Sequence, residues 1–190
     1  TFPEVEDSVR MVNYSPVVKY NDKQIDEQKF VYADPSFFKM FSFKLLQGDP
    51  LNVLDKPNQV VLTESTAKRY FNNENAVGKV LKVGTDTTLY QVTGVIQDCP
   101  SNSQIKFDFL GSWSSLKKAD EEKSFWDANY TTYFLLKNKA DIGSLQAKIP
   151  AFMQKEMSGQ GATINFELEP FSRVHLYSPY PGFEFNNSIT

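Results

Sequence analysis

The sequence has almost none of the side chains from which metal and redox sites are built. Its 190 residues include one cysteine, Cys99, and one histidine, His175. A single cysteine cannot form a disulfide within the chain, and one cysteine with one histidine cannot complete a Cys/His zinc cluster. Glycine-rich phosphate loops of the GxGxxG or Walker type are also missing from the sequence. We therefore predict that the chain holds no cofactor and no metal.

Long apolar runs and an N-terminal leader are missing too. No uninterrupted hydrophobic stretch approaches the roughly 20 residues that cross a bilayer as a helix. The chain starts at Thr1 without a recognisable signal peptide, so we expect it to be an excised or processed fragment of a longer protein. The net charge of −3 argues against nucleic acid or an anionic membrane surface as the main partner.

Aromatic residues, by contrast, are abundant. They make up 14% of the chain, which contains 16 phenylalanines, and a packed core is therefore expected. Hydrophobic residues are 41% and charged residues 23% of the total, the balance of a folded soluble domain. The length suits one domain of ordinary size or two small ones.

The stretch 30–48, FVYADPSFFKMFSFKLLQG, combines the strongest structural signals in the chain. β-forming residues begin it, and a second apolar run ends at a Gly-Asp-Pro stop. Asp34 stands where a helix N-cap belongs, and Pro35 would take the first helical position. Phe37 and Phe41 would share one face of that helix. We predict strand, helix and strand, with both rings in the core.

Periodicity and turn signals predict the other elements. Thr63 and Asp141 are predicted to cap helices, and Pro150 to kink or divide the second of them. Gly94, inside a strand, indicates a bulge or a close approach of two backbones. The predicted strands are 8–18, broken near Pro16, then 59–62, 79–83, 89–96, 105–109, 131–137 and 164–168. Residues 112–123 are predicted to be helix and then loop, and residues 172–190 to be loop.

Two segments share the order strand, helix, strand, around residues 30–47 and again around residues 130–170. A block with its own strands and short helix lies between them, at about 52–112. This pattern predicts an α+β fold in which a discontinuous domain carries an inserted one.

Candidate catalytic residues are few. Cys99 and His175 would be a nucleophile and its base, but no known signature surrounds either of them. Asp98 and Asp108 would be paired carboxylates, but a turn aspartate and a solvent-facing strand residue are the favoured explanation. We therefore predict that the chain is not an enzyme.

The C-terminal segment carries the candidate contact residues. Tyr177, Tyr180, Phe183 and Phe185 lie in a stretch rich in proline and asparagine. Such rings would form a platform for a protein or a sugar, or would simply anchor their own loop. The first possibility makes a secreted, non-catalytic module that binds carbohydrate or peptide an alternative function for the chain.

Three stretches together resemble a known family. They are YADPSFFKMFSFKLLQGDP (32–50), VVLTESTAKRYFNNENAVGKVLKV (60–83) and YQVTGVIQDCPSNSQIKFDFL (90–110). The opening FPEVEDSVR and the late RVHLYS also fit. In order and spacing these stretches resemble the extracytoplasmic core domain of FtsX-like ABC transporter permeases, the MacB-like periplasmic domain.

The resemblance implies an architecture and a location. It implies a porter-like part, made of two βαβ units, at 1–51 and 113–178, and an inserted part, called sabre in the family, at 52–112. Residues 179–190 would lead to a membrane stalk. The domain would stand between the first two transmembrane helices of a permease, on the periplasmic side of the bacterial inner membrane. The long aromatic tail departs from the best-known efflux members, which bears on the choice of adaptor partner.

The resemblance also implies a function without catalysis. ATP-driven motion of the membrane helices would reach the outside through this domain, by mechanotransmission or in efflux, and move a substrate or partner protein. The implied partners are the transmembrane helices, a cytoplasmic ATPase, a second permease copy and a periplasmic adaptor or other extracytoplasmic protein. Nucleic acid is not among them.

Overall fold

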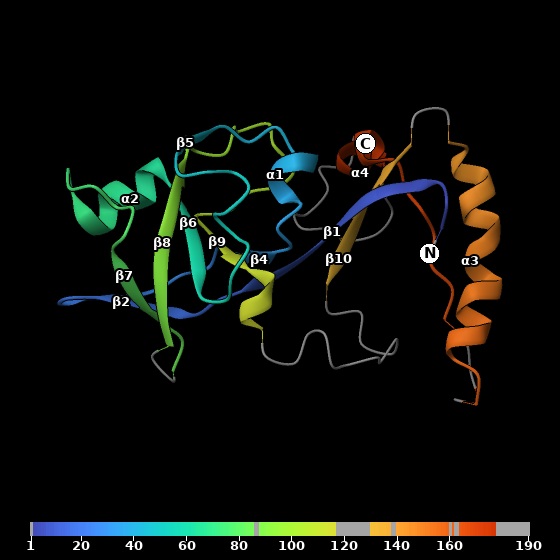
Figure 1. Cartoon of the computed structure of the whole chain (residues 1–190), viewed down its shortest axis with the longest axis horizontal. Helices are drawn as coiled ribbons and strands as arrows, with labels where there is room; N and C mark the ends of the chain where they lie inside the picture. Colours follow the sequence, from blue (N-terminus) through green and yellow to red (C-terminus); the bar gives the residue numbers. More distant parts are fainter. Residues whose placement is uncertain are drawn as a thin grey trace.

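The computed structural model describes residues 2–85, 88–116, 130–137, 140–159, 161 and 164–177. Within these residues the fold is a mixed sheet with few helices, so the predicted α+β class is confirmed (Figure 1). The strands are β1 (Val5–Tyr14), β2 (Val17–Tyr20), β3 (Lys23–Asp26), β4 (Phe30–Ala33), β5 (Leu45–Gln47), β6 (Gln59–Thr63), β7 (Val80–Val83), β8 (Thr88–Ile96), β9 (Phe109–Ser112) and β10 (Thr131–Leu136). The helices are α1 (Phe37–Met40), α2 (Glu64–Phe71), the 3-10 turn η1 (Trp113–Ser115), α3 (Ile142–Glu156) and α4 (Phe171–Tyr177).

All of these strands belong to one ten-stranded sheet. Its order is β10, β1, β4, β9, β6, β8, β7, β2 and β3, and β5 pairs with β8 off this path. Most neighbours are antiparallel, but β4 runs parallel to β9 and β6 runs parallel to β8. The predicted hairpin of β7 and β8 is present, and the predicted break near Pro16 separates β1 from β2.

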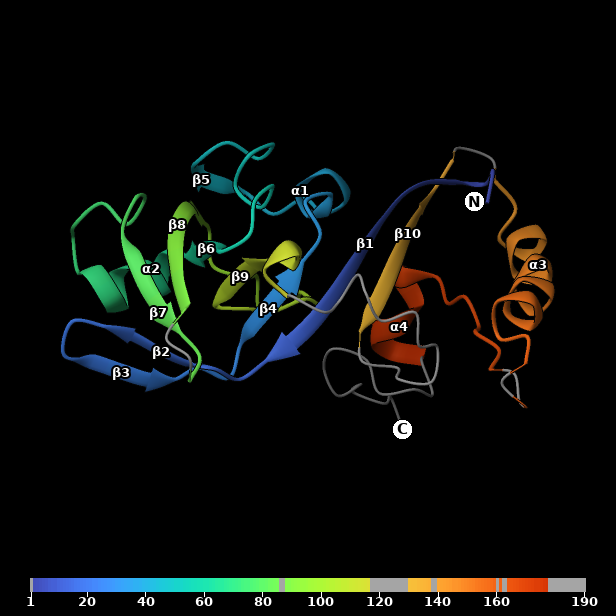
Figure 2. The same cartoon turned by 60° about the horizontal axis from the view of Figure 1, so that its bottom comes forward.

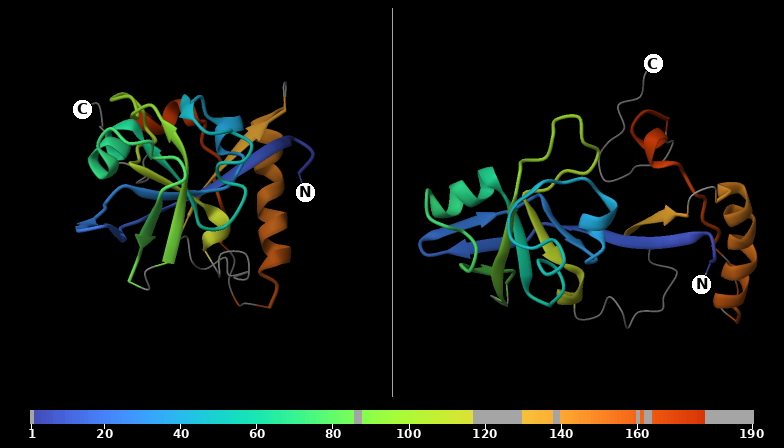
Figure 3. Two further views of the ribbon diagram at one scale, coloured as in Figure 1. Left: turned by 60° about the vertical axis from the view of Figure 1, so that its left-hand side comes forward. Right: turned by 45° about the horizontal axis from the view of Figure 1, so that its top comes forward.

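The molecule is elongated, and β1 runs along much of its length (Figures 2 and 3). The N-terminus and α3 lie at one end, while α2 and the β2–β3 hairpin lie at the other (Figures 1 and 2). The first part of β1 pairs with β10, and its last residues, from Met11 to Tyr14, pair with β4. A continuous backbone ladder therefore connects the two ends.

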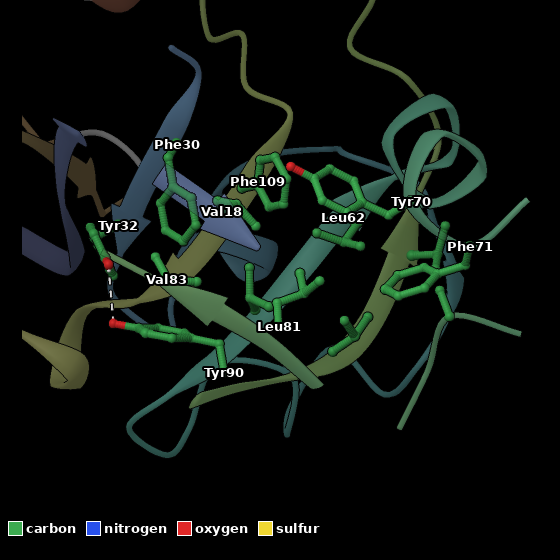
Figure 4. Packing of buried hydrophobic residues seen from close by; sticks show 14 of the residues in the cluster. Val18, Phe30, Tyr32, Leu62, Tyr70, Phe71, Leu81, Val83, Tyr90 and Phe109 are labelled. Carbon is green, nitrogen blue, oxygen red and sulfur yellow. Dashed lines mark hydrogen bonds between the residues drawn. The ribbon is translucent and has the colours of Figure 1, made fainter. Parts of the chain in front are cut away.

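The core lies on both faces of the central strands. In β4, Phe30 and Tyr32 join one apolar cluster and Val31 and Ala33 join another, as the alternation of side chains along a strand requires. Figure 4 shows the first cluster, in which the hydroxyls of Tyr32 and Tyr90 lie 3.0 Å apart. The stretch predicted to organise the fold thus supplies a strand that is buried on both sides.

Two predicted helix caps are confirmed by their side-chain hydrogen bonds. The Thr63 side chain accepts a hydrogen bond from the backbone N–H of Thr66, and Asp141 Oδ1 accepts one of 2.9 Å from Gly143. The helix α3 runs through Pro150 as one element, so the predicted division is wrong. Leu145 and Met153 are buried on either side of the proline, and Ile149 is buried next to it.

Asp34 does not cap a helix, which corrects the prediction. The helix α1 begins after Ser36, with no side-chain cap. Asp34 instead accepts hydrogen bonds of 2.9 Å from Arg10 Nε and Nη2 and one of 2.8 Å from the Arg10 backbone N–H. The Arg10 guanidinium also lies 4.4 Å from the Trp113 ring centroid. A charge-assisted two-point bond is stronger than an ordinary cap, and it ties β1 to the end of β4.

Three further element predictions are wrong. The strand predicted at 105–109 begins only at Phe109, where β4 and β6 flank the chain. Residues 164–168 alternate in polarity but do not form a strand. The side chain of Gln146 instead pairs with their backbone, at the Phe166 carbonyl and the Leu168 N–H. The segment predicted as a C-terminal loop opens with α4.

A buried glutamate holds the β2–β3 hairpin against α2. Glu27 is 4% exposed and accepts hydrogen bonds of 2.9 Å from Arg69 and 2.7 Å from the Tyr70 hydroxyl. Burial and this carboxylate raise the pKa of Tyr70 far above its ordinary value, so the hydroxyl stays protonated and donates to Glu27. The hairpin at the far end of the sheet is thereby fixed to the helix beside it.

Candidate functional site

The predicted aromatic platform falls almost wholly outside the described residues. Tyr180, Phe183 and Phe185 lie beyond Tyr177, where the description of the chain ends. Tyr177 is the last residue of α4, and its side chain is also outside the described part. The platform and the alternative binding function attached to it therefore remain predictions.

Among the candidate catalytic residues, Asp98 and Cys99 have surroundings that indicate a structural role. Asp98, Cys99 and Asp108 line one small pocket of about 210 Å³. Asp98 accepts hydrogen bonds from the backbone and hydroxyl of Ser65 at the start of α2. Burial raises the pKa of the Cys99 thiol, whereas a nucleophilic cysteine needs a lowered one. The side chain of His175 lies outside the described part of α4.

No group of three potential metal-ligating side chains occurs among the described residues. Cys99 lies next to two aspartates, but its sulfur donates to the Phe107 carbonyl at 3.4 Å. These observations offer no preformed metal centre in the part of the chain that the structure describes.

An aromatic triad connects three segments that are far apart in sequence. Phe41 lies 5.3 Å from Tyr133 and 5.8 Å from Phe171, and Tyr133 and Phe171 are 5.6 Å apart, as measured between ring centroids. Such edge-on and tilted contacts are favourable beyond simple burial. Burial raises the pKa of Tyr133 to about 12. The triad joins the end of α1, β10 and α4.

A long apolar cleft of about 750 Å³ extends from this triad along β10. One wall is formed by all six residues of β10, and the other by the start of α3 and by residues 167–171. Phe134, Ile142 and Phe171 are 43%, 38% and 45% exposed, which is unusual for large apolar side chains gathered in one place. Figure 2 shows β10 between β1 and the segment that leads to α4.

The N-terminal segment is fastened to β10 and α3. Lys137 donates from Nζ to the Pro3 carbonyl at 2.6 Å and from its backbone N–H to the Glu4 carbonyl at 2.9 Å. Glu4 forms an ion pair with Lys148, which lowers the pKa of the glutamate. The rings of Phe2 and Phe152 meet edge to face at 5.4 Å. These contacts attach residues 2–4 to the rest of the domain. We call them the N-terminal clamp.

Sequence reasoning missed both the cleft and the clamp. The strand β10 and the apolar face of α3 were predicted, but not their position on two sides of one groove. The only local signal was the run of six uncharged residues in β10, each of them β-forming or apolar. The clamp joins residues more than 130 positions apart, such as Glu4 and Lys148, which no local pattern indicates.

The fold and sequence match known proteins. The family model described as MacB-like periplasmic core domain matches residues 1–152. A domain of a putative permease protein from Porphyromonas gingivalis is similar in structure, with a TM-score of 0.69 and 23% identity over 88% of this chain and 80% of that one. No protein of curated function matches the chain significantly.

Two further solved structures share the fold at lower identity. The periplasmic region of MacB from Actinobacillus actinomycetemcomitans has a TM-score of 0.60 and 16% identity, covering 82% of this chain and 69% of that one. The extracellular domain of the noncanonic ABC-type transporter YknZ from Gram-positive bacteria has a TM-score of 0.57 and 12% identity, covering 86% and 80%. Because the family model covers four fifths of the sequence, the chain belongs to the family of MacB-like periplasmic core domains.

Proposed function

We propose that the chain is the extracytoplasmic domain of an ABC transporter permease and that it couples ATP-driven motion of the membrane helices to work outside the membrane. Membership of the family supports this role, as does the likeness to domains of a permease and of two transporters. The work would be the handling of a substrate or a partner protein. The domain would contribute rigid-body motion and no catalysis.

The observation that carries the proposal is the continuity from the N-terminal clamp through β1 into the sheet. Force applied to residues 2–4 would be transmitted directly to α3 and to the end of β10. The contacts that transmit it are an ion pair, two hydrogen bonds and a ring contact. The strand β1 then pairs with β10 and β4 over ten residues. A hydrogen-bonded ladder of this length resists stretching, so the far end would move with the near end.

The proposed division into two parts rests on how the elements are arranged. A porter-like part at 1–51 and 113–178 would hold the membrane-side end, and a sabre-like part at 52–112 would project from it. In support, α2, β7 and β8 lie toward the end of the molecule away from the N-terminus (Figure 1). The β2–β3 hairpin would move with the inserted part, because β2 pairs with β7. Residues 179–190 would lead to the membrane stalk.

The proposed surroundings follow from this role. The domain would lie on the periplasmic side of the inner membrane, beside the transmembrane helices, with a cytoplasmic ATPase and a second permease copy in the same assembly. A periplasmic adaptor or other extracytoplasmic protein would be the outer partner. In the described residues, no helix has both the length and the apolarity needed to cross a bilayer.

Spin-label distances in the intact transporter test rigid-body coupling. Gln24 on β3 and Gln154 on α3 are exposed, and these two elements lie near opposite ends of the domain (Figure 2). With Cys99→Ser as background, both are replaced by labelled cysteines. We expect the Gln24–Gln154 distance to stay constant when ATP binds, while the distance between Gln154 labels on two permease copies changes.

The matched control is the same labelled transporter with the ATP-binding site of its ATPase disabled, in which neither distance should respond to ATP. A Gln24–Gln154 distance that changes on ATP binding would contradict rigid transmission. Two distances that both stay constant while ATP is hydrolysed would show that the domain does not move with the membrane helices.

A further inference from the structure

The strand β10 forms one edge of the sheet. Among the described residues it pairs only with β1, and the sheet order ends with it. Alternate backbone N–H and C=O groups of an edge strand point away from the sheet, where they are available for another strand. All six residues of β10 line the cleft, so this edge of the sheet borders it.

The two edges of the sheet differ in how they are protected. The opposite edge, β3, has the sequence KQID and carries both Lys23 and Asp26 over four residues. The strand β10 has the sequence TTYFLL, six β-forming or apolar residues without a charge or a proline. Charges and prolines are the usual means by which proteins prevent an edge from pairing with another chain. The edge at β10 lacks this protection.

The opposite wall of the cleft is bound to α3 through one side chain. The Gln146 side chain on α3 donates to the Phe166 carbonyl at 2.9 Å and accepts from the Leu168 N–H at 2.6 Å. Its amide therefore occupies one carbonyl and one N–H of this segment. The Phe166 carbonyl and the Leu168 N–H are thus paired with α3, and among the described residues no strand pairs with β10 on the side away from β1.

The charge of the cleft is of one sign. Glu167 and Glu169 are exposed and line it, and no lysine or arginine is among the described residues that do so. An extended apolar segment with basic residues at its flanks would match this surface in shape, hydrogen bonding and charge.

We propose that β10 is a docking site for an extended, basic-flanked segment of a partner protein, which adds to the sheet as a further strand. The six residues of β10 offer a pairing edge of about 20 Å, at roughly 3.3 Å per residue. Main-chain hydrogen bonds would hold the segment, Phe134 and Phe171 would receive its apolar side chains, and Glu167 and Glu169 would receive its cations. The inference does not depend on the coupling function proposed above.

Binding of a synthetic peptide to the full 190-residue chain tests this assignment. The probe is KKVTVTVTKK, and its matched counterpart is EEVTVTVTEE. We expect the lysine peptide to bind at least about tenfold more tightly than the glutamate peptide, and the difference to shrink as salt is raised. Hydrogen exchange should slow at the alternate amides of Thr131–Leu136 that point away from β1, and stay unchanged in β3.

Two variants keep the test specific. Phe134→Lys puts a charge on the exposed side of β10 and should abolish binding, whereas Gln24→Lys on β3 should leave it unchanged. The double variant Glu167→Lys/Glu169→Lys should reverse the preference, so that the glutamate peptide binds more tightly. Thermal melts check that each variant is folded, and the charge reversal requires no change in β10 itself.

Three results would overturn the proposal. The first is that neither peptide binds at millimolar concentration. The second is that peptide binding leaves the exchange of the β10 amides unchanged, which would mean apolar contact without strand addition. The third is that laurate fills the cleft and excludes the peptide without slowing β10 exchange, which would make the cleft an acyl-chain site.

Discussion

Replacing Phe37 by alanine is expected to lower the free energy of unfolding by about 3–5 kcal/mol, the usual cost of truncating a fully buried phenylalanine. The Phe37 side chain is 0% exposed. Its ring centroid lies 5.3 Å from that of Phe43 in a stacked arrangement and 5.7 Å from that of Phe107 edge on. Removing the ring would leave a cavity. The neighbouring rings of Phe43 and Phe107 are rigid and would fill this cavity poorly. Urea denaturation at equilibrium measures the loss.

The matched control is Phe166→Ala. Phe166 has the same side chain but is 42% exposed, so its truncation should cost less than about 1 kcal/mol. If Phe37→Ala costs no more than Phe166→Ala, the cluster around α1 does not hold the fold together. The stretch 30–48 would then not be the segment that organises the fold.

Replacing Gly48 by alanine should be comparably damaging, by roughly 2–6 kcal/mol. Gly48 has φ of +102°, a conformation that costs about 1–3 kcal/mol for a residue with a side chain. A β-carbon there would also lie 2.6 Å from the Thr93 carbonyl oxygen and 2.8 Å from Val53 Cγ1. A backbone oxygen in a sheet cannot move aside easily, so overpacking adds about 1–3 kcal/mol.

Gly78→Ala separates the two costs. Gly78 has φ of +91°, but a β-carbon at this position would meet nothing within 4 Å. Gly78→Ala should therefore show the cost of strain alone, and Gly48→Ala should exceed it by at least about 1 kcal/mol when both are measured by denaturation. Equal losses would mean that β5 and β8 do not approach as closely as the structure indicates.

Local signals in the sequence predicted local structure well. Thr63 and Asp141 cap their helices because a cap needs only a side-chain oxygen two or three residues before the N–H it accepts from. Gly94 was predicted to mark a bulge or a close approach. The structure shows a register shift beside it and the Gln47 carbonyl within 3.0 Å of where its β-carbon would be.

Predictions failed where a distant residue competes for the same group. Asp34 has the right position for a cap, but Arg10, 24 residues earlier, binds both of its oxygens. Residues 164–168 have the alternation of a strand, but their backbone pairs with Gln146 on a helix. A sequence pattern shows which structure a segment can form. The fold determines which distant residue lies close enough to bind the same group.

The candidate site was harder to predict than the fold. The C-terminal aromatic residues were predicted to be contact residues because they are numerous. The cleft depends instead on Phe134 and Phe171, which stand in unremarkable surroundings in the sequence and meet at one groove only after folding. That β10 is a strand follows from its composition, but that it is an edge follows only from the order of all ten strands.

A disulfide between the two proposed membrane stalks tests the central claim most directly. In the intact transporter, Cys99 is replaced by serine and a cysteine is placed near the end of each stalk. Because ATP-driven motion is proposed to reach the domain through movement of the two stalks relative to each other, crosslinking them should stop transport-coupled activity while the fold stays intact, and reduction should restore the activity. If the crosslinked transporter works at full rate, the domain is not a moving coupler, and a passive binding module would be the better description.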